Sequence, residues 1–236
     1  MTKILLLDIE TRPAMAYVWR LFDENISLDQ LIESGGVLCF GAKWLDDKKK
    51  MFFSEWEHGA EAMARAANAL LQEADAVITY NGDRFDLPKL RGLMVEHKLP
   101  PLPPLTSIDV FKAVKKFSFQ SGKLAYVGPF LKIGQKLKNA GFPLWRAVMA
   151  GDAKAQDKMK KYCLQDVVLL ELVYKRIKPY IMNHPHLGTT SKGNCGTCES
   201  KHLQSRGWRR TKAFRIQRLQ CQSCGSWSDG KREAIK

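Results

Sequence analysis

The stretch KILLLDIET (residues 3–11) places four consecutive apolar residues directly before two acids, Asp8 and Glu10. A short apolar run bounded by charged residues is typical of a buried strand, and we expect a strand from Lys3 to Ile9. Residues two apart on a strand project from the same face, so Asp8 and Glu10 would have Cα atoms about 6.6 Å apart on one side. This spacing suits a hard divalent cation. The polar end of a buried strand has the same pattern, so this pair alone does not decide between the two interpretations.

From this strand outward, hydrophobic periodicity predicts alternating strands and helices. We expect strands at Val37–Trp44, Met51–Trp56, Ala76–Tyr80 and Ile108–Phe111, and helices at Ala60–Ala74, from near Asp86, and at Asp152–Ile181. The first three strands would form a meander, with a charged turn between the second and the third. The order β-β-β-α-β-α-β-α predicts an α/β fold with a mixed central sheet flanked by helices, although other α/β folds share this order.

A second acidic segment, YNGDRFDLPKL (residues 80–90), places Asp86 after an expected strand and at the start of an expected helix. Asn81 and Gly82 suit a tight turn between the two elements. Asp86 is therefore a candidate metal ligand, but aspartate is also a common N-cap at the start of a helix. Asp83 competes for the same role and ranks second, because it lies within the turn itself.

A third segment, YCLQDV (residues 162–167), lies in the long helix expected over Asp152–Ile181. Tyr162 and Asp166 are four residues apart, so they lie on one face of that helix about one turn from each other. Both side chains can therefore face a single site. A tyrosine at this position is otherwise an ordinary residue at the edge of a core.

In this order, the three segments resemble the DEDD superfamily of 3′-to-5′ exonucleases, the DnaQ-like proofreading and RNA-processing nucleases with a ribonuclease H-like fold. The resemblance covers about Met1 to Ile181, and Tyr162 places the chain in the tyrosine (DEDDy) branch. The chain is most similar in kind to predicted exonucleases of phages and bacteria. In those proteins, a stretch like NHPH at residues 183–186 marks the C-terminal end of the catalytic domain.

The resemblance implies a nuclease that hydrolyses phosphodiesters with two Mg²⁺ or Mn²⁺ ions. Asp8 would bridge both ions, Glu10 and Asp166 would complete the site of the ion nearer the nucleophile, and Asp86 would hold the second ion mainly through water. Tyr162 would stay protonated at neutral pH, because an unperturbed tyrosine has a pKa of about 10, and would orient the attacking water by a hydrogen bond.

Four cysteines form two CxxC pairs in the last 42 residues, Cys195 with Cys198 and Cys221 with Cys224. Paired CxxC turns present four thiolates in the tetrahedral arrangement that zinc takes, and a tail with few apolar residues needs such a crosslink in order to fold. We expect one structural Zn²⁺ in a zinc ribbon similar to those of transposases and transcription factors. Two disulfides are the alternative, and a chain without a signal peptide makes them the weaker one.

The tail is also the most basic part of a chain whose formal net charge is +14. Residues 191–236 contain 11 Lys and Arg against 3 Asp and Glu, a net charge of +8. A basic module of this kind favours a polyanionic partner. Candidates for contacts with phosphates and bases on the expected β-hairpin of this tail are Arg206, Trp208, Arg209, Arg210, Arg215 and Arg218.

A length of 236 residues allows one catalytic domain and a small appendage. We expect a ribonuclease H-like exonuclease domain at residues 1–182, a linker at 183–194 and a four-cysteine zinc ribbon at 195–236. No stretch approaches the roughly 20 apolar residues of a membrane span. We therefore expect no membrane partner and a cytoplasmic protein, in the host cytoplasm if a phage encodes the chain.

Three functions fit these patterns. The leading prediction is a 3′-to-5′ exonuclease acting on DNA in replication, repair or recombination, where any protein partners are ones that no motif identifies. The second is an exoribonuclease or structure-specific nuclease on the same fold. The third is a nucleic-acid-binding module without hydrolytic activity, against which the full set of four acids and the tyrosine argues. The choice between DNA and RNA depends on contacts with the 2′-hydroxyl that no motif reveals.

Overall fold

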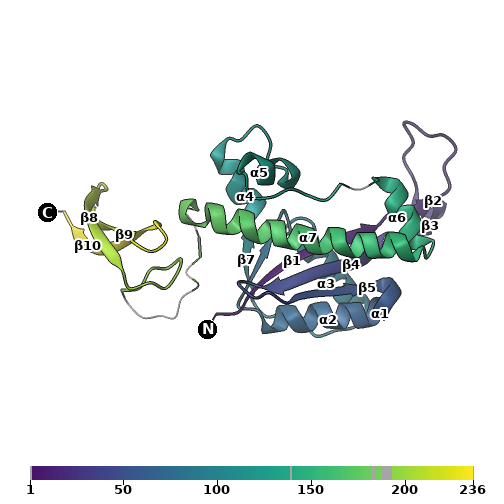
Figure 1. The fold of residues 1–236 in the computed structure, drawn as a ribbon, viewed down its shortest axis with the longest axis horizontal. Coiled ribbons are helices and arrows are strands. Elements are labelled where there is room, and N and C mark those ends of the chain that lie inside the picture. Colours follow the sequence, from purple (N-terminus) through teal and green to yellow (C-terminus); the bar gives the residue numbers. More distant parts are fainter. Residues whose placement is uncertain (1, 139, 182–183, 186, 188–192, 236) are drawn as a thin grey trace.

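A five-stranded mixed sheet forms the centre of the computed structural model, which describes residues 2–138, 140–181, 184–185, 187 and 193–235 (Figure 1). The strand order is β5-β4-β1-β6-β7. The strands are β1 (Ile4–Arg12), β4 (Gly36–Trp44), β5 (Lys50–Ser54), β6 (Ala76–Thr79) and β7 (Thr106–Asp109). β4 pairs antiparallel with β1 and β5, whereas β6 pairs parallel with β1 and β7. The predicted meander and the predicted mixed sheet are both confirmed.

Helices cover both faces of this sheet. Their bounds are α1 (Glu55–His58), α2 (Ala60–Glu73), α3 (Asp86–Glu96), α4 (Val110–Val114), α5 (Leu124–Phe130), α6 (Phe142–Met149) and α7 (Ala153–Ile177). Along β1, Leu5, Leu7 and Ile9 pack in the core that includes α2 and α3, and Leu6 packs in the core that includes α7. Because side chains alternate along a strand, the even-numbered residues of β1 share the α7 side of the sheet.

Close packing of α7 on the sheet depends on a glycine directly opposite Asp8. Gly41 of β4 pairs with Asp8 of β1. A Cβ atom at Gly41 would lie 3.2 Å from the Cys163 sulfur and 3.2 Å from a methyl group of Val167, both on α7. A larger residue there would push α7 outward, since packed interiors leave no room for extra atoms. Gly41 therefore lets α7 approach the strand that carries the first two acids.

Three predicted element boundaries were wrong by a few residues. The strand expected at Ile108–Phe111 is β7, which ends at Asp109, because the Asp109 carboxylate accepts a hydrogen bond from the Phe111 N–H and caps α4. The strand expected to reach Trp56 ends at Ser54, which caps α1 in the same way. The helix expected to reach Ile181 ends at Ile177 and continues as a 3₁₀ turn over Lys178–Tyr180.

An insertion between β1 and β4 was not predicted. It contains β2 (Met15–Ala16), a 3₁₀ turn (Leu28–Gln30) and β3 (Leu31–Glu33), and β2 and β3 pair antiparallel. In Figure 1 it projects from the body of the molecule next to α6. We call residues 15–33 the arm.

The C-terminal residues form a separate three-stranded antiparallel sheet in the order β10-β9-β8. Its strands are β8 (Leu203–Arg210), β9 (Phe214–Cys221) and β10 (Trp227–Ala234). The expected hairpin is present as β8 and β9, and β10 adds a strand. The expected domain end at residue 182 lies outside the described residues, as do Asn183 and His186 of the NHPH stretch and most of the expected linker. Among the described helices, none combines the length and the apolar character needed to cross a membrane.

Candidate active site and cysteine cluster

Three of the predicted acids converge where α7 crosses β1. Asp8, Glu10 and Asp166 each offer a carboxylate oxygen, and these oxygens all lie within 4.8 Å of one another. Asp166 is buried, whereas Asp8 and Glu10 are partly exposed. Tyr162, one turn before Asp166 on α7, packs edge-on against Trp145 of α6 with ring centroids 6.3 Å apart. Residues more than 150 positions apart in the chain thus form one acidic site with a tyrosine at its edge.

The fourth predicted acid, Asp86, lies next to Asp8 and is bonded to the same strand. Its carboxylate accepts a hydrogen bond of 3.1 Å from the N–H of Ile9, the residue between Asp8 and Glu10. Asp86 is 3% exposed. It does not belong to the group of acids within 4.8 Å, so the structure places it next to Asp8 without placing it in the same cluster.

A tight turn after β6 brings Asp86 to this position. Asn81 has a φ of 68°, and Gly82 lies so close to the end of β6 that a Cβ atom there would be 2.3 Å from the Thr79 hydroxyl oxygen. Only glycine fits such an approach. The competing acid, Asp83, bonds instead to Ser107 and to Lys112, each at 2.5 Å. The turn therefore directs Asp83 away from the site and Asp86 toward it.

Burial raises the pKa of every acid in the site. Burial is the main cause of the raised pKa of Asp8, and the charges of Asp86, Glu10 and Asp166 raise it further. Burial and then the charge of Asp166 raise the pKa of Glu10 to about 8. Burial raises the pKa of Asp86 to about 7, even though the hydrogen bond from Ile9 opposes the shift. Burial also raises the pKa of Asp166, against the opposing effect of Lys136.

Lys136 supplies a positive charge to this site, and no sequence motif singled it out. It lies between α5 and α6, and its ammonium group is 2.6 Å from a carboxylate oxygen of Asp166. It also bonds to the Tyr162 hydroxyl and lies 5.0 Å from the centroid of that ring. One lysine among the many of residues 110–151 has no distinguishing neighbour in the sequence, so only the folded structure identifies it.

The residues present fit a divalent cation. The three carboxyl groups of the cluster meet one ammonium group, so the acidic groups outnumber the positive charges in a partly buried place. The second oxygen of Asp166, Oδ1, is buried without a hydrogen-bond partner among the described residues. A buried carboxylate oxygen without a partner is costly, and a bound cation would satisfy it. Oxygen ligands from several carboxylates are the set that Mg²⁺ and Mn²⁺ prefer.

Replacing Lys136 by methionine is expected to strengthen metal binding. The ammonium group competes with a cation for Asp166, so its removal makes the site more negative. At a few ångströms and an effective dielectric constant near 20, one charge alters the binding constant by about tenfold or more. We expect the Mn²⁺ concentration at half-maximal thermal stabilisation to fall by about this factor. The matched control is Lys138→Met, two residues along the same segment. An unchanged Mn²⁺ midpoint in Lys136→Met would show that the lysine does not oppose the cation.

The raised pKa values also predict how metal-free stability varies with pH. Glu10 and Asp86, with pKa values of about 8 and about 7, hold protons more tightly in the folded protein than in the unfolded chain, where carboxyls titrate near 4. Their stabilising contribution is complete below about pH 4 and is lost as the pH rises through about 7 to 8.

We therefore expect the melting temperature in EDTA to fall between about pH 5 and about pH 9. Added Mg²⁺ should raise the melting temperature more at the alkaline end, because metal binding displaces protons. Scanning calorimetry of the wild type and of Glu10→Gln provides the measurement, and the glutamine variant should have the flatter profile. A wild-type profile that rises across this range would contradict the assigned pKa shifts.

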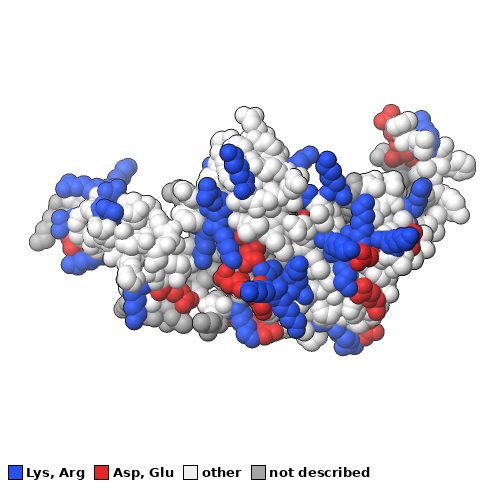
Figure 2. Space-filling model, in the orientation of Figure 1, with Lys and Arg blue, Asp and Glu red and all other residues white. Residues whose placement is uncertain are grey.

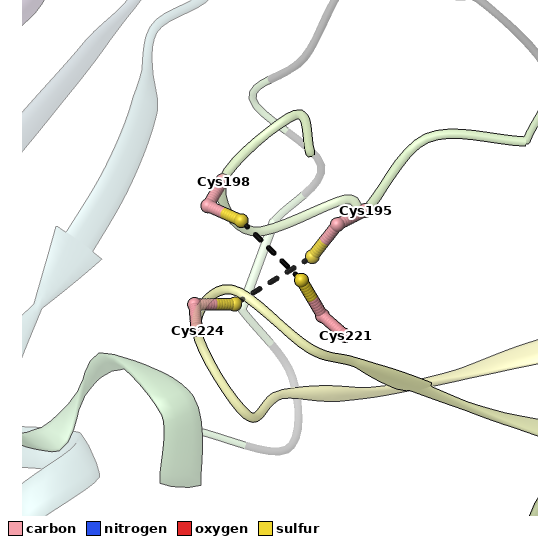
Figure 3. Close-up of side chains that lie close together, drawn as sticks. All are labelled: Cys195, Cys198, Cys221 and Cys224. Carbon is pink, nitrogen blue, oxygen red and sulfur yellow. Dashed lines mark hydrogen bonds between the residues drawn. The ribbon is translucent and has the colours of Figure 1, made fainter. Parts of the chain in front are cut away.

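The four tail cysteines converge in the way the CxxC spacing predicts (Figure 3). Their sulfurs all lie within 4.8 Å of one another, at 3.7 Å between Cys195 and Cys224 and 3.6 Å between Cys198 and Cys221. All four thiols are free, so the alternative of two disulfides is not what the structure has. An ion with tetrahedral coordination and metal–sulfur bonds of about 2.3 Å would hold the sulfurs about 3.8 Å apart. The cluster is compatible with a metal site.

The two CxxC turns share the same backbone hydrogen-bond pattern. The N–H of Cys195 donates to the carbonyl of Ser200, and the N–H of Cys221 donates to the carbonyl of Ser226, in each case five residues later.

Burial alone would raise the pKa of Cys195. Hydrogen bonds from the Ser226 hydroxyl and from backbone N–H groups outweigh burial and lower this pKa to about 6. A thiol that ionises readily is the form that binds metals.

The arginines of this small sheet differ in whether an acidic side chain pairs with them. Arg209 is paired with Asp229 at 2.6 Å, and Arg215 is paired with Glu233 at 2.5 Å. Arg206 and Arg218 bond to a glutamine side chain and to a backbone carbonyl, which leaves their charge uncompensated. Within the described part of the chain, Arg210 forms no ion pair.

Trp208 and Arg210 lie on one face of β8. Trp208 is opposite Gln217, and Arg210 is opposite Arg215. Trp208 is 38% exposed, and the Arg215 guanidinium lies 4.7 Å from its ring centroid.

The protein belongs to the RNase_H superfamily, whose family model matches residues 29–178, more than half of the chain. This assignment agrees with the observed mixed sheet flanked by helices, and the expected ribonuclease H-like fold is confirmed. The matched region includes Asp86, Tyr162 and Asp166, whereas Asp8 and Glu10 precede it.

Two solved structures align with most of this chain. The family B DNA polymerase from the hyperthermophilic archaeon Pyrobaculum calidifontis aligns with a TM-score of 0.58 at 15% identity, over 76% of this chain and 25% of that chain. RNase D of Trypanosoma brucei aligns with a TM-score of 0.47 at 15% identity, over 77% of this chain and 58% of that chain. This chain thus spans a quarter of the polymerase and less than two thirds of the RNase D chain. No curated protein matches it in sequence.

Proposed function

We propose that this protein is a metal-dependent 3′-to-5′ exonuclease of the DEDDy type, which hydrolyses phosphodiester bonds of DNA in single strands or at 3′ ends. The observation that carries the proposal is the convergence of Asp8, Glu10 and Asp166 within 4.8 Å, with Tyr162 one helical turn away. A binding module without hydrolytic activity has no need for buried carboxylates whose mutual repulsion costs stability. Such a cluster is typical of a site that binds cations for catalysis.

Asp8, Glu10 and Asp166 would hold Mg²⁺ or Mn²⁺, with Asp86, next to Asp8, holding a second ion mainly through water. Two ions would neutralise charge on the phosphate and lower the pKa of a bound water. The hydrogen bond from Ile9 to Asp86 fixes the end of β1 relative to α3, so the carboxylates keep their positions when a substrate arrives.

Tyr162 would position the water that attacks the phosphate. Burial raises the pKa of its hydroxyl above the ordinary value, so the group stays protonated at neutral pH and acts as a hydrogen-bonding group instead of a base. Its ring is held by Trp145, and its hydroxyl contacts Lys136. These contacts leave the tyrosine little freedom, and a well-placed hydroxyl can orient water without a conformational cost.

The C-terminal sheet would act as a zinc ribbon that increases affinity for the substrate. Arg210, with no acidic partner among the described residues, and the uncompensated Arg206 and Arg218 suit contacts with phosphates, and Trp208 suits stacking on a base. In this proposal the chain comprises an exonuclease domain over residues 1–182, a linker and the ribbon. DNA is the proposed substrate because the more similar of the two structures above belongs to a DNA polymerase.

A time course on 5′-labelled single-stranded DNA tests this function, with a matched RNA strand in parallel and Mn²⁺ or EDTA in each series. We expect a ladder that shortens from the 3′ end in Mn²⁺ and no cleavage in EDTA. Faster shortening of RNA would make the protein an exoribonuclease. Internal cuts would make it an endonuclease, and tight binding of both strands without cleavage would leave only the binding-module function.

A further inference from the structure

The arm, residues 15–33, exposes an unusual amount of apolar surface. Of the 19 exposed large hydrophobic residues in the described structure, nine lie in this segment. The most exposed are Trp19 at 93%, Leu21 and Leu28 at 86%, and Phe22 at 80%. A contiguous apolar patch on a protein surface marks an interaction site more often than chance exposure, because water contact with such a patch is unfavourable.

Hydrogen bonds within the arm hold it in a defined shape. The Tyr17 N–H donates to the Gln30 carbonyl at 2.9 Å, and the Gln30 side chain donates back to the Tyr17 carbonyl at 3.0 Å. The Glu24 carboxylate accepts the N–H groups of Trp19 and Arg20 at 3.1 Å and 2.8 Å. An ordered loop that presents large side chains to solvent is preorganised for binding, since little entropy is lost when a partner arrives.

The charge of the arm indicates a protein partner and argues against nucleic acid. The segment has four acids and one arginine, a net charge of −3 on a chain of +14. Figure 2 shows acidic side chains on this projection. Nucleic-acid affinity arises mainly from cations that replace counterions on phosphates, and this segment would repel phosphates. The arm therefore fits an apolar surface surrounded by positive charge.

The same chain has a surface of that kind at the other end of α7. A pocket of about 370 Å³ is lined by Phe117, Phe119, Leu131, Arg176, Ile177 and Tyr180. Arg176 is the cation among its lining residues, and Lys115, Lys116 and Lys132 are close in sequence to its apolar residues Phe117 and Leu131. We call this the basic pocket. Its apolar walls suit a tryptophan or phenylalanine side chain, and its cations suit the acids of the arm.

Within one copy of the chain, the arm and the basic pocket lie far apart. The base of the arm contacts a cavity shared with Gln156 near the start of α7, whereas Arg176 lines the basic pocket near its end. Twenty residues of helix separate them, or about 30 Å. Two further exposed apolar residues, Leu137 and Phe142, lie on the chain segment between α5 and α6 and at the start of α6.

We propose that the arm of one copy docks into the basic pocket of a second copy, and that the exchange is mutual in a two-fold symmetric dimer. A two-fold axis between the two surfaces brings each arm to the pocket of the other copy, so the association closes at two copies. Trp19 and Phe22 supply the apolar contact, and Asp29 faces Arg176. Asp29 is exposed and forms no ion pair among the described residues, which leaves its charge available.

Sedimentation velocity of the full-length protein tests this proposal at concentrations from about 1 µM to about 100 µM, a range that detects micromolar dissociation constants. The wild type should be dimeric at the upper end, and Trp19→Ser combined with Phe22→Ser should be monomeric. Asp29→Lys and Arg176→Glu should each weaken the dimer about tenfold or more, and the two together should restore it. Glu61→Lys, on α2 across the sheet, is the matched control and should leave the dimer unchanged.

Three results would overturn the proposal: a wild type that is monomeric throughout this range, a dimer that survives the loss of both aromatic residues, or charge reversals that fail to rescue each other. A monomer that loses affinity for single-stranded DNA when Trp19 and Phe22 are replaced would also overturn it and make the arm a nucleic-acid contact. Unchanged melting temperatures in the variants show that the arm substitutions leave the rest of the protein folded. Self-association does not depend on nuclease activity, so the test is independent of the proposed function.

Discussion

Asp8→Asn is expected to abolish metal-dependent DNA cleavage and to raise the melting temperature of the protein in EDTA. Asp8 lies at the centre of the acidic cluster, where burial and the other three acids all raise its pKa. The amide has nearly the same shape but no charge, so it cannot hold a cation as the carboxylate does. We expect turnover to fall by at least about a thousandfold, because catalytic residues that act as a unit lose most of their effect when one of them is removed.

The gain in stability has the same physical origin as the loss of activity. In the metal-free protein, burial and the neighbouring acids disfavour the ionised form of Asp8 that the unfolded chain has, and asparagine removes this cost of folding. Cleavage assays with Mn²⁺ and calorimetry in EDTA measure the two effects on one preparation. Asp157→Asn, on an exposed part of α7, is the matched control and should change neither quantity. Full activity of Asp8→Asn would remove the acidic cluster from the proposed mechanism.

Cys221→Ser should unfold the C-terminal sheet while leaving the rest of the protein folded. The sheet is small, and its described core contains few buried residues, among them Ile216 and the cysteines themselves. A zinc site with four cysteine ligands supplies on the order of 10–16 kcal/mol of folding free energy at neutral pH, more than such a small core can replace. Serine removes one of the four thiolates that form the site.

Four measurements on Cys221→Ser separate the two parts of the chain. Zinc content should fall from one ion per chain to none, amide exchange in β8, β9 and β10 should become fast, and the main calorimetric transition should persist. If the ribbon adds the tethered contact to the substrate that we propose, the Michaelis constant should rise more than turnover falls. Ser223→Ala, within the same CxxC turn, should leave all four quantities unchanged. Slow exchange in the three strands without bound zinc would show that the sheet is stable without its metal.

Sequence patterns identified the strand and helix types correctly for most of the central sheet. The buried apolar runs of β1 and β4 and the long apolar stripe of α7 are all local signals in the sequence. The boundaries that were wrong depend on side-chain caps. Asp109 and Ser54 each accept a backbone hydrogen bond that ends a strand and begins a helix, and nothing in the apolar pattern reveals which residue does so.

The arm and Lys136 show what local patterns cannot reveal. The apolar content of residues 15–33 is compatible with a buried segment. Only the fold shows that these side chains face solvent. Lys136 resembles the other lysines of its segment until the chain between α5 and α6 brings it to 2.6 Å from Asp166. In both cases the surroundings of a side chain come from residues distant in the sequence.

The residue types and spacings of both candidate metal sites can be read from the sequence. Asp8 with Glu10, Tyr162 with Asp166, and the two CxxC pairs each lie on one local element, where period and turn geometry relate neighbouring residues directly. The folded structure was needed to show that α7 approaches β1 closely enough for Asp166 to meet Asp8, that Asp86 bonds to that strand, and that Lys136 faces the cluster. The physical reason is packing: the small Gly41 and the tight turn at Gly82 set these distances, and their effect appears only when the elements they separate come together.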